Sequence, residues 1–377
     1  MRPLSSKLAA IAPSATIEIT DKARKMRAVG IDVISLSIGE PDFPTPAHIT
    51  TACIDALNRG DTHYAPGKGI PALLSAIAEK IETENGFSCT PDQVIVTCGA
   101  KDAIYEACEA VLSSGDEAII LDPSWVSYEP CIQIAGGVPV HHPLNLKNFQ
   151  VDDTLLERIT DRTRMIIINS PSNPSGSILN RDSLRLVSDI CQDHDLIALS
   201  DEIYEKLVYG QIHFSLGMFP EMADRTITIN GFSKAYAMTG WRLGYGVAPK
   251  EIIGYMNRVQ QHTISHPTTF AMYGGVAALK GPQQCIEEMR REFEHRREFV
   301  LNRLMDMGMS YAPAEGAFYA YIKVDGDDAA IAETWLQEAH VAVTPGVAFH
   351  TPGWIRMSYA ASMDTLADAM HRIEQVI

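Results

Sequence analysis

The sequence predicts an α/β protein whose central sheet is mainly parallel. Short runs rich in Ile, Val and Leu alternate with stretches of helical periodicity along much of the 377-residue chain, which is typical of such a sheet with helices packed on it. The runs are continuously apolar rather than alternating, as expected of strands covered on both faces. Because 46% of the residues are hydrophobic, the chain can build its core without disulfides or structural metals.

The predicted strands are short, and each ends at polar residues or at Gly or Pro. Five runs fit this description, and Tyr245–Val247 is a weaker sixth; the five are Gln93–Cys98, Ala118–Leu121, Arg164–Asn169, Leu196–Ser200 and Thr226–Asn230. Helical patterns lie between them, at Ala100–Leu112 and at Arg181–Asp193, where apolar residues recur at helical spacing.

A long charged segment, Gln283–Met307, predicts an amphipathic helix that links two bodies. After it the sequence predicts short strands and a closing helix, at Ala317–Val324, Val341–Thr344, Trp354–Tyr359 and Asp364–Val376. We therefore expect a large domain at residues 47–282. The N-terminal arm, residues 1–46, is expected to join residues 283–377 in a smaller, split α+β domain.

The overall charge excludes several classes of partner. The chain has 31 Lys and Arg against 47 Asp and Glu, a net charge of −16, which disfavours binding to nucleic acid or to an anionic membrane surface. No apolar run approaches the roughly 18 residues of a membrane helix, and no secretory signal is expected. The seven cysteines are odd in number and form no CxxC pair, which favours reduced thiols in the cytoplasm.

The adjacent histidines His141 and His142 have no further ligand at metal-binding spacing in the sequence. They are expected to be surface or loop residues, and no metal site is predicted.

Polar sequence follows several predicted strands directly. In open α/β sheets, ligands bind beyond the carboxyl ends of the strands. These polar strand ends are Gly99–Lys101, Asp122–Trp125, Asn169–Pro174, Asp201–Tyr204 and Gly231–Lys234. The sequence therefore predicts a binding site at this edge of the sheet.

Lys234 lies just beyond a predicted buried strand, among the aromatic and apolar residues Phe232, Tyr236, Met238 and Trp241. Desolvation there would lower its pKa and favour a neutral amine that can form a Schiff base. A solvated surface lysine is the alternative that these residues alone leave open.

The segment Gly231–Gly244 matches the pyridoxal-phosphate attachment signature of class I/II aminotransferases, including an arginine eight residues after the lysine. The chain resembles the aspartate-aminotransferase-like family of fold type I nearly from end to end. Besides this segment, seven blocks occur in the family's order: the other four polar strand ends, Leu36–Phe43, Tyr64–Pro71 and Ile355–Ala360. The resemblance implies a mainly parallel seven-stranded sheet and pyridoxal 5'-phosphate as cofactor.

The resemblance also assigns three catalytic residues. Lys234 would carry the cofactor and later move the proton between substrate and cofactor carbons. Asp201 would pair with the protonated pyridine nitrogen, and Tyr204 would hydrogen-bond the phenolate oxygen. By itself, an aspartate at a strand end could equally be a helix cap.

The phosphate of the cofactor would bind at the turn Gly99, Ala100 and Lys101, where backbone N–H groups open a helix. Arg242 would add charge and Ser233 a hydroxyl. Some family members place a hydroxyl three residues before the lysine, where this chain has Gly231, so one part of the phosphate network differs.

The remaining site residues surround the ring and the substrate. Trp125 would stack on the pyridine ring, although most tryptophans are core residues. Asn173 would contact both the phenolate oxygen and the substrate carboxylate, which Arg356 would clamp and the backbone of Gly39 would approach. Tyr64 would come from the second subunit of a homodimer with shared active sites.

These residues predict ping-pong transamination between an L-amino acid and a 2-oxo acid. By the resemblance, aspartate or a related amino acid is the candidate donor, and aromatic amino acids, alanine and other donors remain open. No basic residue marks a clamp for a second substrate carboxylate. A C–S lyase or β-eliminase would use the same anchors, and a non-catalytic binding or regulatory protein is a third hypothesis. The last would tolerate loss of Lys234 or Asp201, and both are present.

Overall fold

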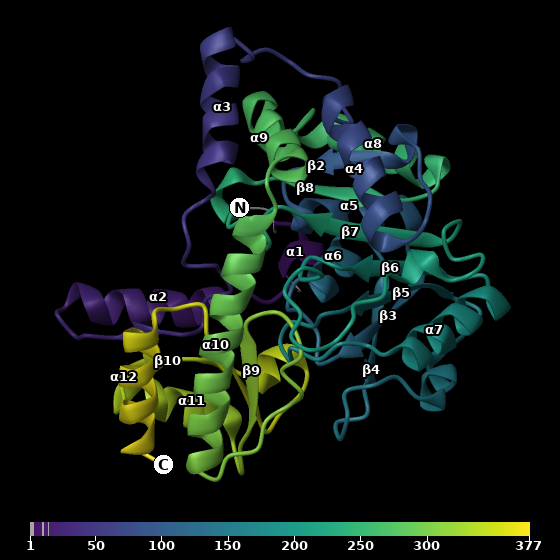
Figure 1. The fold of residues 1–377 in the computed structure, drawn as a ribbon. Coiled ribbons are helices and arrows are strands. Elements are labelled where there is room, and N and C mark those ends of the chain that lie inside the picture. Colours follow the sequence, from purple (N-terminus) through teal and green to yellow (C-terminus); the bar gives the residue numbers. More distant parts are fainter. Residues whose placement is uncertain (1–3, 10, 14) are drawn as a thin grey trace.

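Seven strands form the central sheet of the computed structural model, which describes residues 4–9, 11–13 and 15–377. Their spatial order is β2-β8-β7-β6-β5-β3-β4 (Figure 1). β8 runs antiparallel to β2 and β7, and the other neighbouring pairs are parallel. The predicted α/β fold with a mainly parallel sheet is thus confirmed. The strands are β2 (Val94–Thr97), β3 (Glu117–Asp122), β4 (Val138–Pro143), β5 (Thr163–Asn169), β6 (Ile197–Asp201), β7 (Thr226–Gly231) and β8 (Gly244–Val247).

Sequence reasoning missed β4, and the expectation for its two histidines was wrong. β4 is an edge strand that pairs only with β3, so it carries no continuous apolar run, and Pro139 is tolerated there. His141 and His142 lie within this strand rather than in a loop. His142 is buried and His141 partly so.

Helices cover both faces of the sheet, which explains the continuous apolar strands. In β3, for example, Ala118 and Ile120 pack with the helices of one face, while Ile119 and Leu121 pack with α7 on the other. The first face carries α5 (Ala100–Val111), α6 (Tyr128–Ala135) and α8 (Lys250–Thr263). The second carries α7 (Arg181–Asp193), α4 (Pro71–Lys80) and α9 (Thr269–Lys280), and α3 (Ala47–Arg59) packs on α9.

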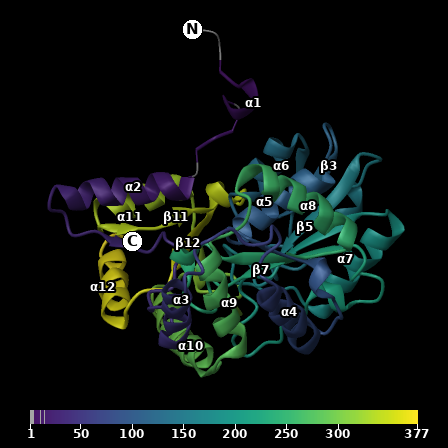
Figure 2. The same ribbon diagram turned by 90° about the horizontal axis from the view of Figure 1, so that it is seen from above.

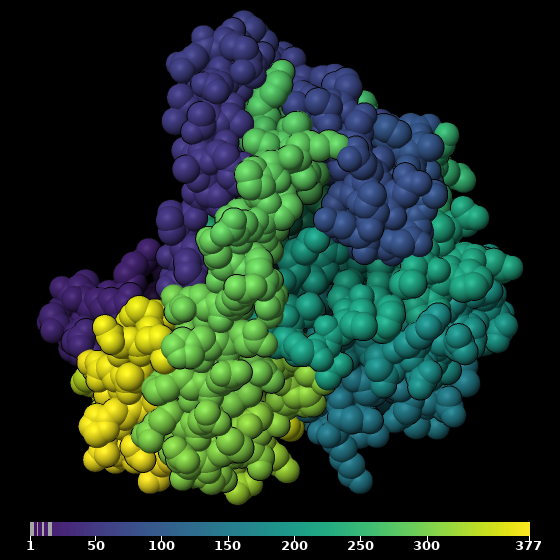
Figure 3. Space-filling model, viewed as in Figure 1, coloured from purple at the N-terminus to yellow at the C-terminus, as the bar shows by residue number. Residues whose placement is uncertain are grey.

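A second body lies beside the sheet and combines both ends of the chain (Figures 2 and 3). β9 (Tyr319–Lys323), β12 (Trp354–Ser358) and β11 (Thr344–Pro345) form its antiparallel sheet, and β1 (Ile34–Ser35) pairs with β10 (Val341–Ala342). Its helices are α2 (Ala15–Ala28), α10 (Gln284–Asp306), α11 (Asp328–Gln337) and α12 (Met363–Glu374). The domain limits at 46/47 and 282/283 remain a prediction.

The remaining elements are short. The helix α1 spans Ser6–Ala9, and single turns occur at η1 (Ile81–Asn85), η2 (Pro91–Gln93), η3 (Asp153–Arg158), η4 (Leu216–Met218), η5 (Thr239–Trp241) and η6 (Gly346–Phe349). All seven cysteines are free thiols. Over the described part of the chain, no helix combines the length and apolarity needed to cross a bilayer.

Candidate active site

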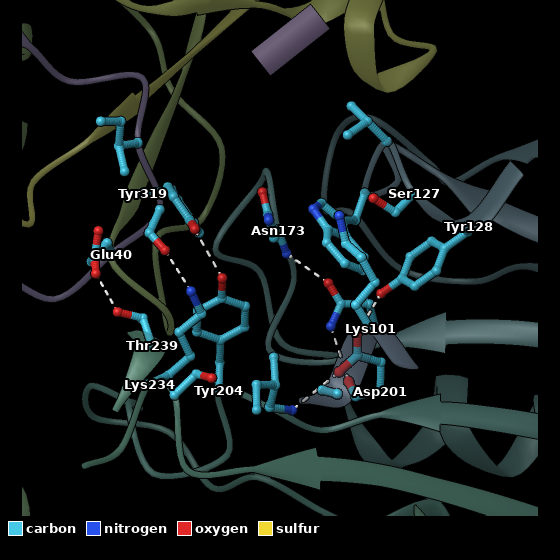
Figure 4. Close-up of a pocket in the computed structure, with 18 of the residues that line it drawn as sticks. Glu40, Lys101, Ser127, Tyr128, Asn173, Asp201, Tyr204, Lys234, Thr239 and Tyr319 are labelled. Atoms are coloured by element: carbon cyan, nitrogen blue, oxygen red, sulfur yellow. Dashed lines mark hydrogen bonds between the residues drawn. The ribbon is translucent and has the colours of Figure 1, made fainter. Parts of the chain in front are cut away.

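The carboxyl ends of the parallel strands open into a cavity of about 370 Å³ (Figure 4). Both bodies line it, because Gly39, Tyr319 and Arg356 face the strand ends across the opening. The predicted site at this edge of the sheet therefore has a physical counterpart. The predicted residues that line the cavity are Gly39, Ala100, Lys101, Trp125, Asn173, Asp201, Tyr204, Ser233, Lys234, Arg242 and Arg356.

Lys234 follows β7 and reaches the cavity without a carboxylate partner among the described residues. Its ammonium donates to the backbone carbonyl of Gly39 and lies 5.8 Å from the ring centroid of Tyr204 and 5.7 Å from that of Phe318. Burial lowers the pKa of Lys234 to about 8; the negative charge of Glu40 opposes this shift, and the positive charge of Arg356 supports it. A neutral amine is therefore accessible near neutral pH, as Schiff-base chemistry requires.

Asp201 is the last residue of β6 and is buried. The Tyr128 hydroxyl donates to its carboxylate at 2.7 Å, and the Ile203 N–H donates at 3.3 Å. Burial raises the pKa of Asp201 to about 6, although both hydrogen bonds oppose this shift. No ion pair involves Asp201 within the described ranges, so a cationic ligand group would relieve an uncompensated carboxylate.

Two tyrosines meet beside Lys234. The hydroxyls of Tyr204 and Tyr319 are hydrogen-bonded at 2.8 Å, and burial raises the pKa of the Tyr204 phenol well above its usual value. A side chain on Gly39 would overlap the Tyr319 hydroxyl, so only glycine lets this backbone approach so closely.

The start of α5 forms an anion cradle. Gly99 adopts a φ of +87°, and a Cβ there would come within 2.6 Å of the Arg242 guanidinium. The first N–H groups of α5, at Ala100 and Lys101, have no intrahelical acceptors by helix geometry, and Arg242 brings a positive charge beside them. Helix dipole and guanidinium together suit a phosphate group.

The hydroxyl that is missing at Gly231 has a packing explanation. Gly231 pairs with Gly244 between β7 and β8, and a Cβ on Gly231 would lie 3.0 Å from the Gly244 Cα. The close approach of the two strands thus leaves little room for a serine, and Ser233 is the hydroxyl that lines the cavity.

Arg356 projects from β12 and is buried. It donates to Asn173 Oδ1 at 2.8 Å and to the Ser37 carbonyl at 2.5 Å, while its Nε has no hydrogen-bond partner in the part of the chain that is described. An unpartnered guanidinium donor beside a cavity is suited to bind a carboxylate.

The side chain of Lys101, and not only its backbone, belongs to the cavity. Its ammonium lies 4.8 Å from the Trp125 ring centroid, and burial lowers the pKa of Lys101. Trp125 packs edge-on against Tyr128 at 5.5 Å between centroids, which leaves its indole as a flat wall of the cavity. Sequence reasoning did not foresee this second use of Lys101.

Tyr64 does not reach the cavity of its own chain. It is 92% exposed and packs edge-on against His266. Its assignment to the active site of a second subunit remains a prediction.

Three further residues of the site were not predicted from the sequence. Tyr128 holds Asp201, Tyr319 holds Tyr204, and Asn169 links the backbones of Asp201 and Asn173 through its side-chain amide. Asn169 lies at a strand end that the sequence already marks as polar, although no role of its own was predicted for it. The two tyrosines carry no local signal that distinguishes them from core residues.

These groups fit pyridoxal phosphate. The cavity supplies an uncompensated lysine, a carboxylate for a protonated ring nitrogen, a phenol for an oxyanion, an anion cradle and a flat indole. Such a set characterises an enzyme that handles amines on a flat, phosphorylated cofactor.

Comparison with known proteins gives the same result. The sequence profile of the aminotransferase class I and II family matches residues 31–373. The chain is 42% identical to an aspartate aminotransferase of Geobacillus stearothermophilus, over 99% of this chain and 98% of the relative. It is 41% identical to an aspartate/prephenate aminotransferase of Thermus thermophilus, over 100% and 99%. The aspartate aminotransferase of Thermus thermophilus solved with maleate superimposes with a TM-score of 0.97 at 40% identity and covers 100% of both chains.

The chain belongs to the aminotransferase class I and II family. It is a pyridoxal-phosphate-dependent transaminase of fold type I, as the sequence predicts.

Proposed function

We propose that this enzyme moves the amino group of aspartate, or of a closely related L-amino acid, to a 2-oxo acid in a ping-pong reaction. The observation that carries the proposal is the arrangement of four cations around one cavity: Lys101, Lys234, Arg242 and Arg356. Each has a distinct chemical use, and together they match a dicarboxylic substrate beside a phosphorylated cofactor.

Lys234 is the proposed attachment point and proton carrier. When bound, the cofactor supplies an electron sink for charge that develops at the substrate Cα. The amine of Lys234, with its pKa lowered to about 8, would take the Cα proton and hold it for its return. A pKa near the working pH suits a group that must both accept and donate.

Arg356 and Asn173 are proposed to hold the substrate α-carboxylate. The guanidinium of Arg356 lines the cavity, and its buried Nε has no partner among the described residues, which supports an anion bound beside it. Fixing that carboxylate orients the Cα–H bond toward Lys234, which replaces a diffusive search by a preset geometry.

Asp201 and Tyr204 are proposed to hold the ring nitrogen and the ring oxygen of the cofactor. Trp125 would cover the ring, and Arg242, Ser233 and the Gly99–Lys101 turn would hold the phosphate.

Lys101 is the proposed partner of a second substrate carboxylate. With Arg242 beside the helix start and Arg356 on the α-carboxylate, Lys101 is the remaining cation, and it lies over Trp125 at the cavity wall. The relative solved with maleate, a dicarboxylate, supports a dicarboxylic substrate. A related amino acid would need an anionic or otherwise polar side chain to use this ammonium.

We also propose a cytoplasmic homodimer whose active sites are shared. The exposed Tyr64 phenol has few contacts in its own chain, as expected of a residue that completes a neighbouring site. The size of the protein in solution, measured by light scattering, and rescue of activity by mixing inactive Tyr64→Phe and Lys234→Ala subunits test this assembly. A monomer with full activity would contradict it.

The substrate proposal is tested with a panel of amino acids against 2-oxoglutarate, pyruvate and oxaloacetate. Amino-group transfer should exceed release of ammonia and pyruvate; the opposite ratio would favour the β-eliminase alternative. Lys101→Met should lower kcat/KM for aspartate by roughly 10- to 100-fold, because a charged hydrogen bond is lost. The kcat/KM for alanine as substrate should stay nearly unchanged. Lys147→Met, an exposed lysine outside the cavity, is the matched control.

A further inference from the structure

A second cluster of ionisable side chains lies at the junction of the two bodies, apart from the cavity residues that bind substrate. His141 comes from β4 and Glu129 from α6, both in the body of the large sheet, while His350 follows η6 in the C-terminal body. One ligand atom from each lies within 4.8 Å of the others. His350 lies more than 200 residues after the other two, so the fold brings it to them.

The protonation of His141 is set by a buried carboxylate behind it. Asp122, at the end of β3, lies 2.9 Å from His141 Nδ1, and the Ser124 hydroxyl donates to the other Asp122 oxygen at 2.7 Å. An ionised carboxylate can only accept, so Nδ1 carries a hydrogen, and in the neutral form of the ring Nε2 then has the free lone pair. That Nε2 is buried and has no hydrogen-bond partner among the described residues. A carboxylate behind an imidazole whose far nitrogen is free is the usual arrangement around a metal-bound histidine.

Glu129 is held in a similar way. Gln133 donates to Glu129 Oε1 at 2.9 Å, which leaves Oε2 facing the two histidines. Oε2 lies 3.7 Å from His141 Nε2 and 3.1 Å from His350 Nε2. Two N or O ligands of a tetrahedral zinc ion, each about 2.1 Å from it, lie about 3.4 Å apart, and the two observed separations bracket this value.

The imidazoles are stacked, with ring centroids 3.8 Å apart and an interplanar angle of 29°. His141 is fixed by Asp122, whereas the His350 side chain is 39% exposed. The exposed His350 ring would therefore have to turn out of this stack for both lone pairs to meet at one ion, while His141 stays fixed.

We propose that His141 Nε2, Glu129 Oε2 and His350 Nε2 bind a divalent transition metal of the Zn²⁺ type, with water as the fourth ligand. Two histidines and one carboxylate form a ligand set that zinc takes in proteins. Because His350 belongs to the C-terminal body and the other two ligands to the sheet body, the ion ties the two bodies together.

A second group of similar composition, Glu202, Glu205 and His213, does not share this chemistry. Lys80 already forms an ion pair with Glu205, and Asn85 donates to both carboxylates. The Glu129 cluster has no lysine or arginine ion pair among the described residues, so its carboxylate is free to take a metal.

The proposed metal site adjoins the catalytic cavity. Glu129 follows Tyr128, whose hydroxyl holds Asp201. The Ser124 N–H donates to the Phe349 carbonyl at 3.3 Å, next to His350. A metal ion there therefore restrains the junction beside Asp201 and Trp125, and links metal binding to the relative position of the two bodies.

The test uses the cofactor-loaded enzyme after dialysis against a chelator. Titration with ZnCl2 followed by calorimetry should give one equivalent per chain, and CoCl2 should give the visible absorption of a tetrahedral ion without a near-ultraviolet thiolate band. His141→Gln and His350→Gln should each remove this equivalent. Asp122→Asn should weaken binding by about 10- to 100-fold, as expected when the partner behind a metal ligand is lost.

His371→Gln, an exposed histidine on α12, is the matched control and should bind as the unaltered protein does. Zn²⁺ should raise the unfolding temperature of the unaltered enzyme and of His371→Gln, but not that of His350→Gln. No saturable binding, a thiolate band, or an equivalent that survives in His141→Gln would overturn the site. Loss in His141→Gln with retention in His350→Gln would overturn the bridge between the bodies.

Discussion

Two buried polar regions lie back to back at the end of β6, and they treat their charges in opposite ways. Asp201 faces the catalytic cavity, whereas the next residue, Glu202, faces a network behind the sheet. Glu202 accepts from the hydroxyls of Ser200 and Ser215, each at 2.8 Å. Asp201 has no cationic partner in the described chain, so its carboxylate is left to pair with a cationic group of a ligand.

The two buried lysines show the same contrast. Lys80 pairs with Glu205 and donates to Asn85 Oδ1 at 2.6 Å, and this charge holds the pKa of Glu205 at about 2 even though burial acts to raise it. Lys234 contacts a backbone carbonyl and aromatic rings and forms no ion pair with any described residue, although the charges of Glu40 and Asp201 act on it. The network is thus saturated and serves stability, while the cavity is left unsaturated and serves binding.

The largest effect that tests this contrast is expected from removal of Lys234, the lysine of the cavity. Lys234→Ala should lower turnover by more than about 1,000-fold, because both the covalent anchor and the proton carrier are lost. Treatment with borohydride should no longer fix the cofactor to the protein, as mass spectrometry can show. In the Lys80→Met variant, borohydride should still fix the cofactor to the protein. Substantial transamination by Lys234→Ala would refute the assigned role.

Removal of the lysine of the network should act on stability instead. Lys80→Met leaves Glu205 buried without its partner, so the free energy of unfolding should fall by about 3–5 kcal/mol. Denaturant unfolding of the cofactor-free protein measures this change. Lys234→Met should unfold at the same denaturant concentration as the unaltered protein or at a higher one. Equal losses in the two variants would show that the cavity is as saturated as the network.

The two adjacent carboxylates provide the next comparison. Glu202→Gln should lower the free energy of unfolding by about 1.5–3 kcal/mol, the usual contribution of a hydrogen bond to a charged group. Asp201→Asn should lower activity but not the stability of the cofactor-free protein at pH 7, because it removes an uncompensated buried charge.

The pH dependence of stability tests the same point. The pKa of Asp201 is raised from 3.8 to about 6, so the folded state binds its proton more tightly than the unfolded state does. The contribution of this group to stability is therefore full below about pH 4 and is lost as pH rises to about 6. Denaturant titrations across this range should show the loss in the unaltered protein, and a smaller one in Asp201→Asn.

The smallest effect concerns how the cofactor attaches. With the pKa of Lys234 lowered from 10.5 to about 8, the neutral amine accumulates up to about pH 8 and then changes little. The rate at which cofactor-free protein takes up pyridoxal phosphate, followed by absorbance, should therefore rise through pH 7–8 and level off above it. A rate that climbs steadily toward pH 10 would indicate an ordinary solvated lysine.

Local sequence was sufficient to predict those parts of the molecule in which the burial of an element shows in its own residues. The inner strands β3, β5, β6 and β7 were predicted within about a residue or two, because burial on both faces demands continuous apolar runs. Their polar ends marked the cavity, since the carboxyl ends of parallel strands share one edge. Lys234 and Arg242 lie in one contiguous segment, so their spacing was visible as well.

Other features depended on residues that are distant in the sequence, and only the tertiary structure decided them. The edge strand β4 lacks the burial that makes an inner strand recognisable. Tyr128 meets Asp201 across 73 positions, and Tyr319 meets Tyr204 across 115. The direction of the Lys101 side chain depends on where Trp125 lies.

The same distinction separates the catalytic cavity, which binds anions, from the proposed metal site, which binds a cation. Through its resemblance to a known family, the sequence alone predicted that one lysine, one aspartate and two arginines hold a phosphorylated cofactor and a carboxylate. The meeting of His141, Glu129 and His350, and the saturation of Glu202 beside the unsaturated Asp201, were decided by packing. Hydrogen-bond partners and desolvation depend on which surfaces the fold brings together, and no local pattern of residues encodes that.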